Sequence, residues 1–187
     1  MSSSKPKRLF KKLLLVFAVA LVVFAIVVVM RPNEFRVTRT VTMNAPAAAV
    51  FAQVNDLSKW QPWSPWAKLD PAAKNSFAGP ASGKDASFSW VGNHEVGEGR
   101  MTITESRPNE FIRFHLEFFK PMAGTSTAEW TFKSEGNQTT VTWLMFGKND
   151  LIGKAVCLFM NMDAMIGGQF ENGLASLKTI VETVPKP

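Results

Sequence analysis

The chain offers few side chains that could perform acid, base or metal chemistry. Its two histidines, His94 and His115, fall at an expected hairpin tip and in the middle of an expected strand, whereas a histidine-based metal site needs its ligands close together. Neither a glycine-rich phosphate loop nor a GxSxG motif is present, and Cys157 has no plausible catalytic histidine. Glu95 is a weak candidate for a general acid. We expect no metal and no cofactor, and the sequence leaves open whether the protein is an enzyme.

Large aromatic side chains are concentrated in one short segment. Trp60, Trp63 and Trp66 lie three residues apart, with Pro62 and Pro65 between them. The prolines remove two backbone donors and bias the preceding residues toward extended geometry, so we expect polyproline II instead of a helix. Three residues per turn would then place the indoles in one row. This row could close the open end of a sheet, line a pocket entrance, or dock on a bilayer interface.

Alternating apolar and polar residues predict an antiparallel sheet. We expect strands at residues 35–43, 85–91, 95–105, 110–119, 126–133 and 139–146, with a weaker one at 72–78. A short helix is expected at 45–54, and an apolar stripe at spacings of three and four from Met162 to Val181 predicts a long C-terminal helix. Because no helices separate the later strands, the expected class is α+β, an antiparallel sheet covered by a terminal helix.

Two turns set the expected hairpin registers. Gly92-Asn93 and Gly136-Asn137 are typical of two-residue loops. The first register sets Phe88 opposite Gly97 and Trp90 opposite Glu95, and the second sets Trp130 opposite Trp143. The inner face of the sheet then carries Phe88, Trp90, Gly97, Gly99, Met101, Ile103, Phe114, Leu116, Trp130, Phe132 and Trp143. Gly97 and Gly99 lack side chains, so they predict either a sharp bend or space for a ligand.

The C-terminal helix should cover this inner face. Its first turns contribute Met162, Met165, Ile166 and Phe170, with Gly167 and Gly168 among them. Flexible thioethers beside glycines either fill the core or form a lid over ligands of varied shape. We expect the inner face of the sheet, these helix residues and the three tryptophans to line a ligand cavity.

The N-terminal region has the composition of a membrane anchor. Residues 1–12 carry five Lys or Arg and no acid, and residues 13–30 are 18 residues without a charge, which span about 27 Å at about 1.5 Å per residue. A cleaved signal peptide is the rival, but its apolar region is usually about 7 to 15 residues and ends at a small-residue site. We expect a single-pass anchor with a cytoplasmic N-terminus, a linker at 31–34, and an extracytoplasmic domain at 35–184.

The positive charge is localised in that N-terminal region. Five of the 21 Lys and Arg lie before Met30, which leaves 16 to face all 15 Asp and Glu. The domain is therefore nearly neutral, and a nucleic-acid-binding surface is poorly supported. Cys157 is the only cysteine, so it cannot form an internal disulfide.

Four stretches carry a further resemblance: TRTVTMNAPAAAVFAQVNDLSKWQPWSPW, GEGRMTITESRPNEFIRFHLEF, TSTAEWTFKSEGNQTTVTW and MIGGQFENGLASLKTIVE. Together they resemble the START-like (SRPBCC) helix-grip superfamily, and within it the polyketide cyclase/dehydrase-like group, over about Phe35 to Glu182. The resemblance implies a curved seven-stranded antiparallel sheet gripping a long C-terminal helix. It also implies a hydrophobic cavity between them that holds lipids, sterols, polyketides or other apolar molecules.

Three functions are compatible with these observations. The leading one is a membrane-anchored protein that binds an apolar small molecule or lipid. The second is a polyketide cyclase/dehydratase-like enzyme acting in the same cavity, with Glu95 as its acid. The third is a non-catalytic interaction module of an envelope assembly, for which the tryptophan row is the interface and the protein partner is unknown.

Overall fold

The structure is a computed structural model that describes residues 5–183. The first residues of the expected cytoplasmic segment and the expected domain end at residue 184 lie outside this range. Within it the chain forms two compact units, one of residues 5–33 with 149–161 and one of residues 34–148 with 162–183. Each unit is described below by itself.

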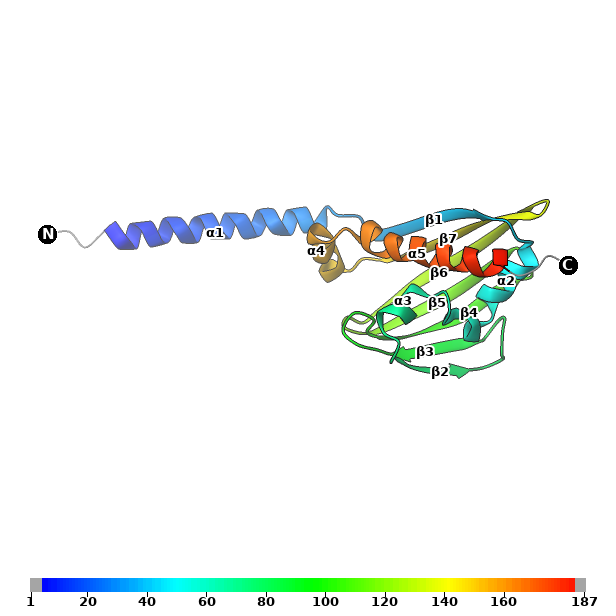
Figure 1. Cartoon of the computed structure of the whole chain (residues 1–187). Helices are drawn as coiled ribbons and strands as arrows, with labels where there is room; N and C mark the ends of the chain where they lie inside the picture. Colours follow the sequence, from blue (N-terminus) through cyan, green and yellow to red (C-terminus); the bar gives the residue numbers. More distant parts are fainter. Residues whose placement is uncertain (1–4, 184–187) are drawn as a thin grey trace. The chain divides into compact units, whose positions relative to one another are not determined.

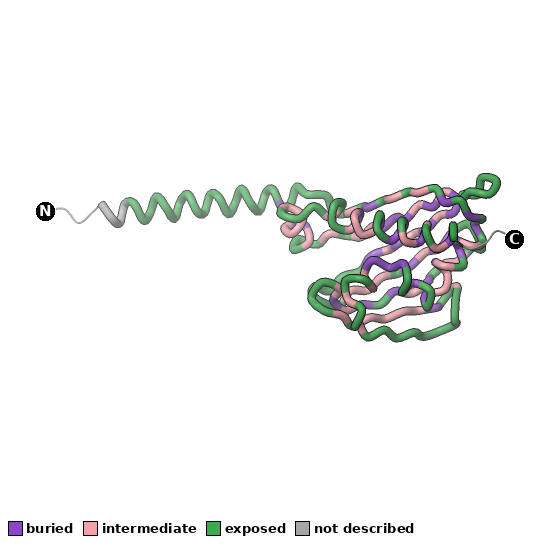
Figure 2. The backbone as a smooth tube through the Cα atoms, in the orientation of Figure 1, coloured by how far each residue is buried: buried purple, intermediate pink, exposed green. Residues whose placement is uncertain are grey.

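The first unit consists of two helices, α1 (Lys5–Val29) and α4 (Leu151–Phe159). From Leu9 to Val29, α1 is long and apolar enough to be a membrane span or a signal sequence. Its side chains from Leu9 onward are exposed except at Val28, as the green tube in Figure 2 shows.

The second unit is a seven-stranded antiparallel sheet with helices on one face, shown in Figure 1. The strand order is β1-β7-β6-β5-β4-β3-β2. The strands are β1 (Glu34–Met43), β2 (Lys74–Ala78), β3 (Ser87–Val91), β4 (Glu98–Arg107), β5 (Phe111–Lys120), β6 (Gly124–Glu135) and β7 (Gln138–Lys148). The helices are α2 (Ala47–Asn55), the 3-10 helix η1 (Leu57–Trp60), α3 (Pro65–Leu69) and the long α5 (Met162–Thr183). The expected α+β helix-grip layout is confirmed, including the weak strand at β2.

The β6–β7 hairpin has the expected register. Trp130 pairs with Trp143, and Phe132 pairs with Val141. Glu135 pairs with Gln138 across the two-residue turn, where Gly136 has a φ of +60°. A glycine adopts this left-handed conformation at little cost, which is why the Gly-Asn signal predicted the turn correctly.

The expected β3–β4 register is wrong by four residues. Trp90 pairs with Gly99, not Glu95, and Phe88 pairs with Met101, not Gly97. The connection is a six-residue loop closed by hydrogen bonds from Gly92 N–H to Gly97 O at 2.8 Å and from Gly97 N–H to Asn93 O at 2.7 Å. The Asn93 side chain stabilises this longer loop, because its Oδ1 accepts from two backbone amides, those of residues 95 and 96. An even shift preserves which residues face inward, but it removes Glu95 and Gly97 from the strand.

The tryptophan segment is helical, so the polyproline II prediction is wrong. Asp56 is the N-cap of η1, and its carboxylate accepts a hydrogen bond from Ser58 N–H at 3.1 Å. Pro65 then occupies the first position of α3, where its missing N–H would have had no partner. Only Ser64, directly before Pro65, keeps the extended geometry that proline imposes, with φ −62° and ψ 126°.

Candidate functional site

An apolar cavity of about 200 Å³ lies within the second unit, lined by the sheet, the η1–α3 segment and α5. The η1–α3 segment contributes Trp60, Gln61, Ser64, Trp66, Ala67 and Asp70 to its lining, and α5 contributes Ile166 and Phe170. The remaining lining residues are Ala73, Asn75, Phe88, Trp90, Val96, Met101, Phe114, Leu116, Phe118, Ala128, Trp143 and Met145. Most of the wall is therefore apolar or aromatic.

Stacked aromatic rings form the rigid part of this wall. The ring centroids of Trp143 and Phe170 are 3.9 Å apart with an interplanar angle of 7°, and those of Trp143 and Trp130 are 4.4 Å apart. Trp66 meets Trp143 edge to face at 5.8 Å. The ring centroids of Trp60 and Trp63 are 4.5 Å apart, and Trp60 donates its indole N–H to Val54 O at 3.0 Å. Such contacts add to the stabilisation from burial alone, so they hold the aromatic wall in place.

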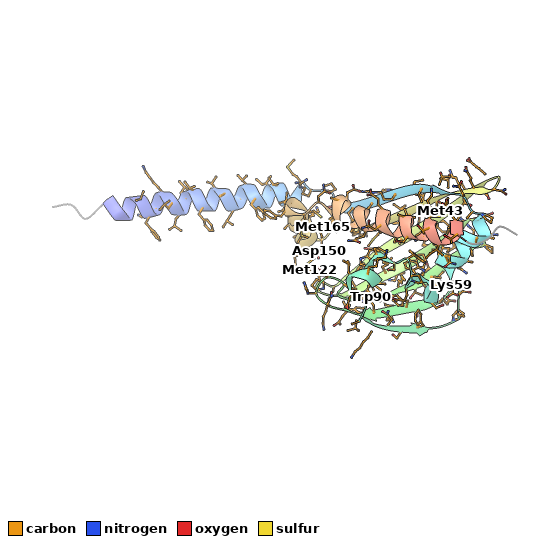
Figure 3. All side chains as sticks on the ribbon, in the orientation of Figure 1. Met43, Lys59, Trp90, Met122, Asp150 and Met165 are labelled. Atoms are coloured by element: carbon orange, nitrogen blue, oxygen red, sulfur yellow. The ribbon has the colours of Figure 1, made fainter. Side chains whose placement is uncertain are left out.

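Ten of the expected ligand-binding residues meet at the cavity. They are Trp60, Trp66, Phe88, Trp90, Met101, Phe114, Leu116, Trp143, Ile166 and Phe170. Trp90 on β3 is labelled in Figure 3. That these side chains contact a ligand stays a prediction, but they share one space.

The other expected residues lie elsewhere in the second unit. Trp63, Ile103, Trp130 and Phe132 are buried in the core without lining the cavity. Met162 and Met165 do not line it either, and Met165, labelled on α5 in Figure 3, is exposed. Glu95 is exposed in the loop between β3 and β4, outside the cavity lining.

The two glycines accommodate close contacts and leave no space for a ligand. A Cβ at Gly99 would lie 2.4 Å from the Trp90 ring and 2.6 Å from Glu117 O. Gly97 has a φ of +68°, and a Cβ there would lie 2.2 Å from Lys120 O. The β4–β5 pairing is also irregular at Glu98/Gly99. Of the two expectations for these glycines, local irregularity of the strand is therefore the one that the structure supports.

Four polar residues at the cavity were not anticipated: Gln61, Ser64, Asp70 and Asn75. The Asp70 carboxylate is already satisfied, because it accepts from Asn93 N–H at 2.6 Å and from Ala72 N–H at 3.1 Å. Ser64 is only 8% exposed, and its hydroxyl neither caps α3 nor has a hydrogen-bond partner among the residues that the structure describes. The Ser64 hydroxyl oxygen itself is not fully buried, so it is available to a molecule in the cavity.

An arginine on the inner side of β1 was also missed. Arg39 donates to both Asp163 carboxylate oxygens, at 2.9 and 3.0 Å, and to Glu171 at 2.5 Å. Hydrogen bonds to Asp163 and then Glu171 raise the pKa of Arg39, and the Arg39 guanidinium lowers the pKa of Asp163. A Cβ at Gly167 would lie 2.0 Å from Arg39 Nη2, so glycine at this point of α5 makes room for the guanidinium.

Ten lining residues were missing from the sequence-based set. The same strand parity would place Phe118, Ala128 and Met145 on the inner face, so these three were within reach of prediction. Asn75 lies on the short, exposed strand β2, and the rest, Gln61, Ser64, Ala67, Asp70, Ala73 and Val96, belong to helical turns and loops. Such segments carry no periodic signal that assigns a side chain to a face.

The sequence matches the family described as polyketide cyclase / dehydrase and lipid transport over residues 34–182. No curated protein sequence matches the chain.

Solved structures share the fold at low sequence identity. Protein CV1439 from Chromobacterium violaceum is 17% identical, with a TM-score of 0.55, and the alignment covers 83% of this chain and 100% of that protein. The Aha1 dimer from Colwellia psychrerythraea is 14% identical, with a TM-score of 0.58 and coverages of 81% and 99%. The di-domain ARO/CYC BexL from the BE-7585A biosynthetic pathway is 15% identical, with a TM-score of 0.58, and the alignment covers 85% of this chain and 53% of BexL.

Proposed function

Because this chain belongs to the polyketide cyclase / dehydrase and lipid transport family, we propose that it binds an apolar small molecule or a lipid chain between its sheet and α5. The observation that carries the proposal is the cavity of about 200 Å³, with its mainly apolar and aromatic lining. For comparison, an apolar cavity of about 150 Å³ is large enough to bind benzene. The cavity therefore suits a ligand portion of about one ring or a short acyl segment.

The lining also favours a ligand with one hydrogen-bonding group. Ser64 is the buried polar side chain of the cavity wall, and Gln61 lies on the same segment. A hydroxyl or carbonyl oxygen of the ligand placed against Ser64 would give its hydroxyl a hydrogen-bond partner. A neutral, mostly apolar molecule with one oxygen is thus the ligand class that the wall fits best.

Binding is better supported than catalysis in this cavity. Asp70 is the titratable side chain among the lining residues, and two backbone N–H groups already occupy its carboxylate. A cyclase or dehydratase needs an acid or base within reach of the reacting atoms. Glu95, the candidate from the sequence, is not among the lining residues.

The proposal includes a membrane anchor. We assign α1 as a single membrane span, with the basic N-terminal residues in the cytoplasm and the cavity outside it. The apolar segment Leu9–Val29 supports a span, and five basic residues before residue 13 against Arg31, Arg36 and Arg39 after it support the orientation. A topology reporter fused after Pro187 tests this assignment, and a cytoplasmic signal would contradict it.

Lipid analysis of the full chain tests the binding proposal. The protein would be purified from membranes in mild detergent, and bound molecules extracted and identified by mass spectrometry. The matched control is Ala128→Leu, which places a larger side chain in the cavity wall. We expect an apolar molecule that is retained by the native protein and depleted from the variant. Equal recovery from both proteins would assign the molecule to another surface, and no retained molecule in either would count against binding.

A further inference from the structure

Helix α4 exposes apolar side chains of a size that soluble helices normally bury. Its nine residues read LIGKAVCLF. Leu151, Ile152 and Phe159 are exposed, Phe159 to 80%, and Met160 directly after the helix is exposed too. At about 3.6 residues per turn, Leu151, Ile152 and Phe159 fall within about 100° of one another around the helix axis. They therefore form one apolar face, which we call the α4 face.

Within the first unit, α4 is attached to the C-terminal end of α1. The rings of Phe24 and Phe159 stack with centroids 6.4 Å apart. Lys154 is buried, and its Nζ donates to Val29 O at 3.3 Å. The last carbonyls of a helix have no partner in the helix itself, so this lysine satisfies one of them.

Hydrogen bonds also fix the segment after α1 and the segment before α4. Asn149 N–H donates to Asn33 O at 2.7 Å, which joins the segment after α1 to the segment before α4. Asp150, labelled in Figure 3, caps α4 by accepting from Gly153 N–H at 2.7 Å. Specific hydrogen bonds therefore determine where α4 begins and where it lies beside α1, in addition to the apolar contact between Phe24 and Phe159.

The attachment point sets the depth of α4 in a membrane. Phe24 lies five residues before Val29, which is about 8 Å along a helix that rises about 1.5 Å per residue. Interfacial helices bury their apolar face about 5 to 10 Å into the boundary between headgroups and acyl chains. If α1 spans the bilayer, the contact with Phe24 places α4 at that boundary.

We propose that α4 is an interfacial membrane helix that lies beside the end of α1 with the α4 face in the lipid. The proposal rests on the membrane anchoring included in the proposed function, and it adds a second membrane contact in a distant part of the chain. The exposed apolar surface of α1 adjoins α4 in the same unit, so one lipid environment would cover both. Burial of the α4 face in lipid also removes a large apolar area from water.

Site-directed fluorescence on the full chain tests this placement. In a Cys157→Ala background, single cysteines at Leu151, Ile152 or Phe159 would carry an environment-sensitive NBD label. The protein would be reconstituted into phosphatidylcholine vesicles with and without doxyl-labelled lipid. Val22 on α1 is the positive control, and Phe77, an exposed apolar residue on β2, is the negative control.

We expect doxyl lipid to reduce the emission of the α4 and Val22 labels about twofold or more, as for groups inside the acyl region, and to leave the Phe77 label unchanged. Quenching at Val22 without quenching at any α4 position would overturn the inference and leave the anchor standing. Absence of quenching at Val22 and α4 alike would overturn both. Three α4 positions keep the result independent of one poorly folding variant, and circular dichroism checks each fold.

Discussion

Ala128→Leu should stabilise the ligand-free protein, because its new side chain enters an existing cavity. Ala128 lies on β6 opposite Met145, is 5% exposed and lines the cavity. Leucine adds three carbons, and at about 0.8 kcal/mol for each buried methylene the gain is at most about 2.4 kcal/mol. For a domain of this size about 1 kcal/mol shifts Tm by about 2 to 4 °C, so we expect an increase of up to about 5 to 10 °C.

The matched control is the same substitution at an alanine that does not line the cavity. Ala47 on α2 is 6% exposed and belongs to the packed core. Forcing extra methylenes into close-packed surroundings costs about 1 to 3 kcal/mol, so Ala47→Leu should lower Tm. The two variants therefore differ in the sign of the change and not only in its size.

Differential scanning calorimetry of the delipidated full chain in detergent measures both shifts. Binding of toluene, followed through fluorescence of the lining tryptophans, supplies the second measurement, and Ala128→Leu should weaken it at least about tenfold if the side chain and the ligand compete for one space. A Tm decrease for Ala128→Leu as large as that for Ala47→Leu would refute the reasoning. It would mean that sheet and helix pack against each other without usable space.

Three further results are expected. Gly168→Ala should raise the free energy of unfolding by about 0.5 to 1 kcal/mol through helix propensity, since a Cβ there meets no atom within 4 Å. Gly167→Ala should give a lower Tm than Gly168→Ala, because its Cβ displaces Arg39. An equal gain at both positions would remove Arg39 from the explanation. Ser64→Ala should weaken the binding of p-cresol by about 0.5 to 1.5 kcal/mol, the contribution of one hydrogen bond, and leave the binding of its isostere p-xylene, which has no hydroxyl, unchanged; equal losses for both ligands would exclude a polar contact at Ser64. Because Arg39 lowers the pKa of Asp163, this carboxylate stabilises the fold above the ordinary pKa of aspartate, and the contribution disappears as pH falls below about 4. In urea unfolding between pH 5 and 3, the free energy of unfolding should therefore fall less steeply with pH for Asp163→Asn than for the native protein. Identical pH dependences of the two proteins would contradict the assignment.

The sheet was predictable because its signal is local. Side chains alternate with a period of two, and the Gly136-Asn137 turn fixes the β6–β7 register within a few residues. The β3–β4 register failed because the deciding contacts are not local. Asp70, 23 residues before Asn93, accepts from its backbone N–H, and the Asn93 side chain holds the longer loop. A Gly-Asn pair alone does not report these partners.

The tryptophan segment and Arg39 show a second limit of sequence patterns. Proline signals excluded a continuous helix but not two short ones, because Pro65 can begin a helix as well as interrupt one. Arg39 was read as one of the charges that follow the apolar span, although its partner Asp163 is 124 residues away. An arginine on the inner side of an edge strand becomes meaningful only when the helix that pairs with it is in place.

The placement of α5 gives a physical reason why the cavity does not collapse. The helix approaches its neighbours closely at Gly167, beside Arg39, and at Gly173, where a Cβ would lie 3.1 Å from both Pro65 and Trp143. These two glycines are six residues apart, about 9 Å along the helix, and Phe170 lies between them. Phe170 stacks on Trp143, which in turn stacks on Trp130. Since α5 is supported on both sides of Phe170, it cannot move further toward the sheet without breaking the ion pairs or the ring stack. The space beside the stack is thereby maintained by the same contacts that fix the helix, which is what a binding site that exists before its ligand requires.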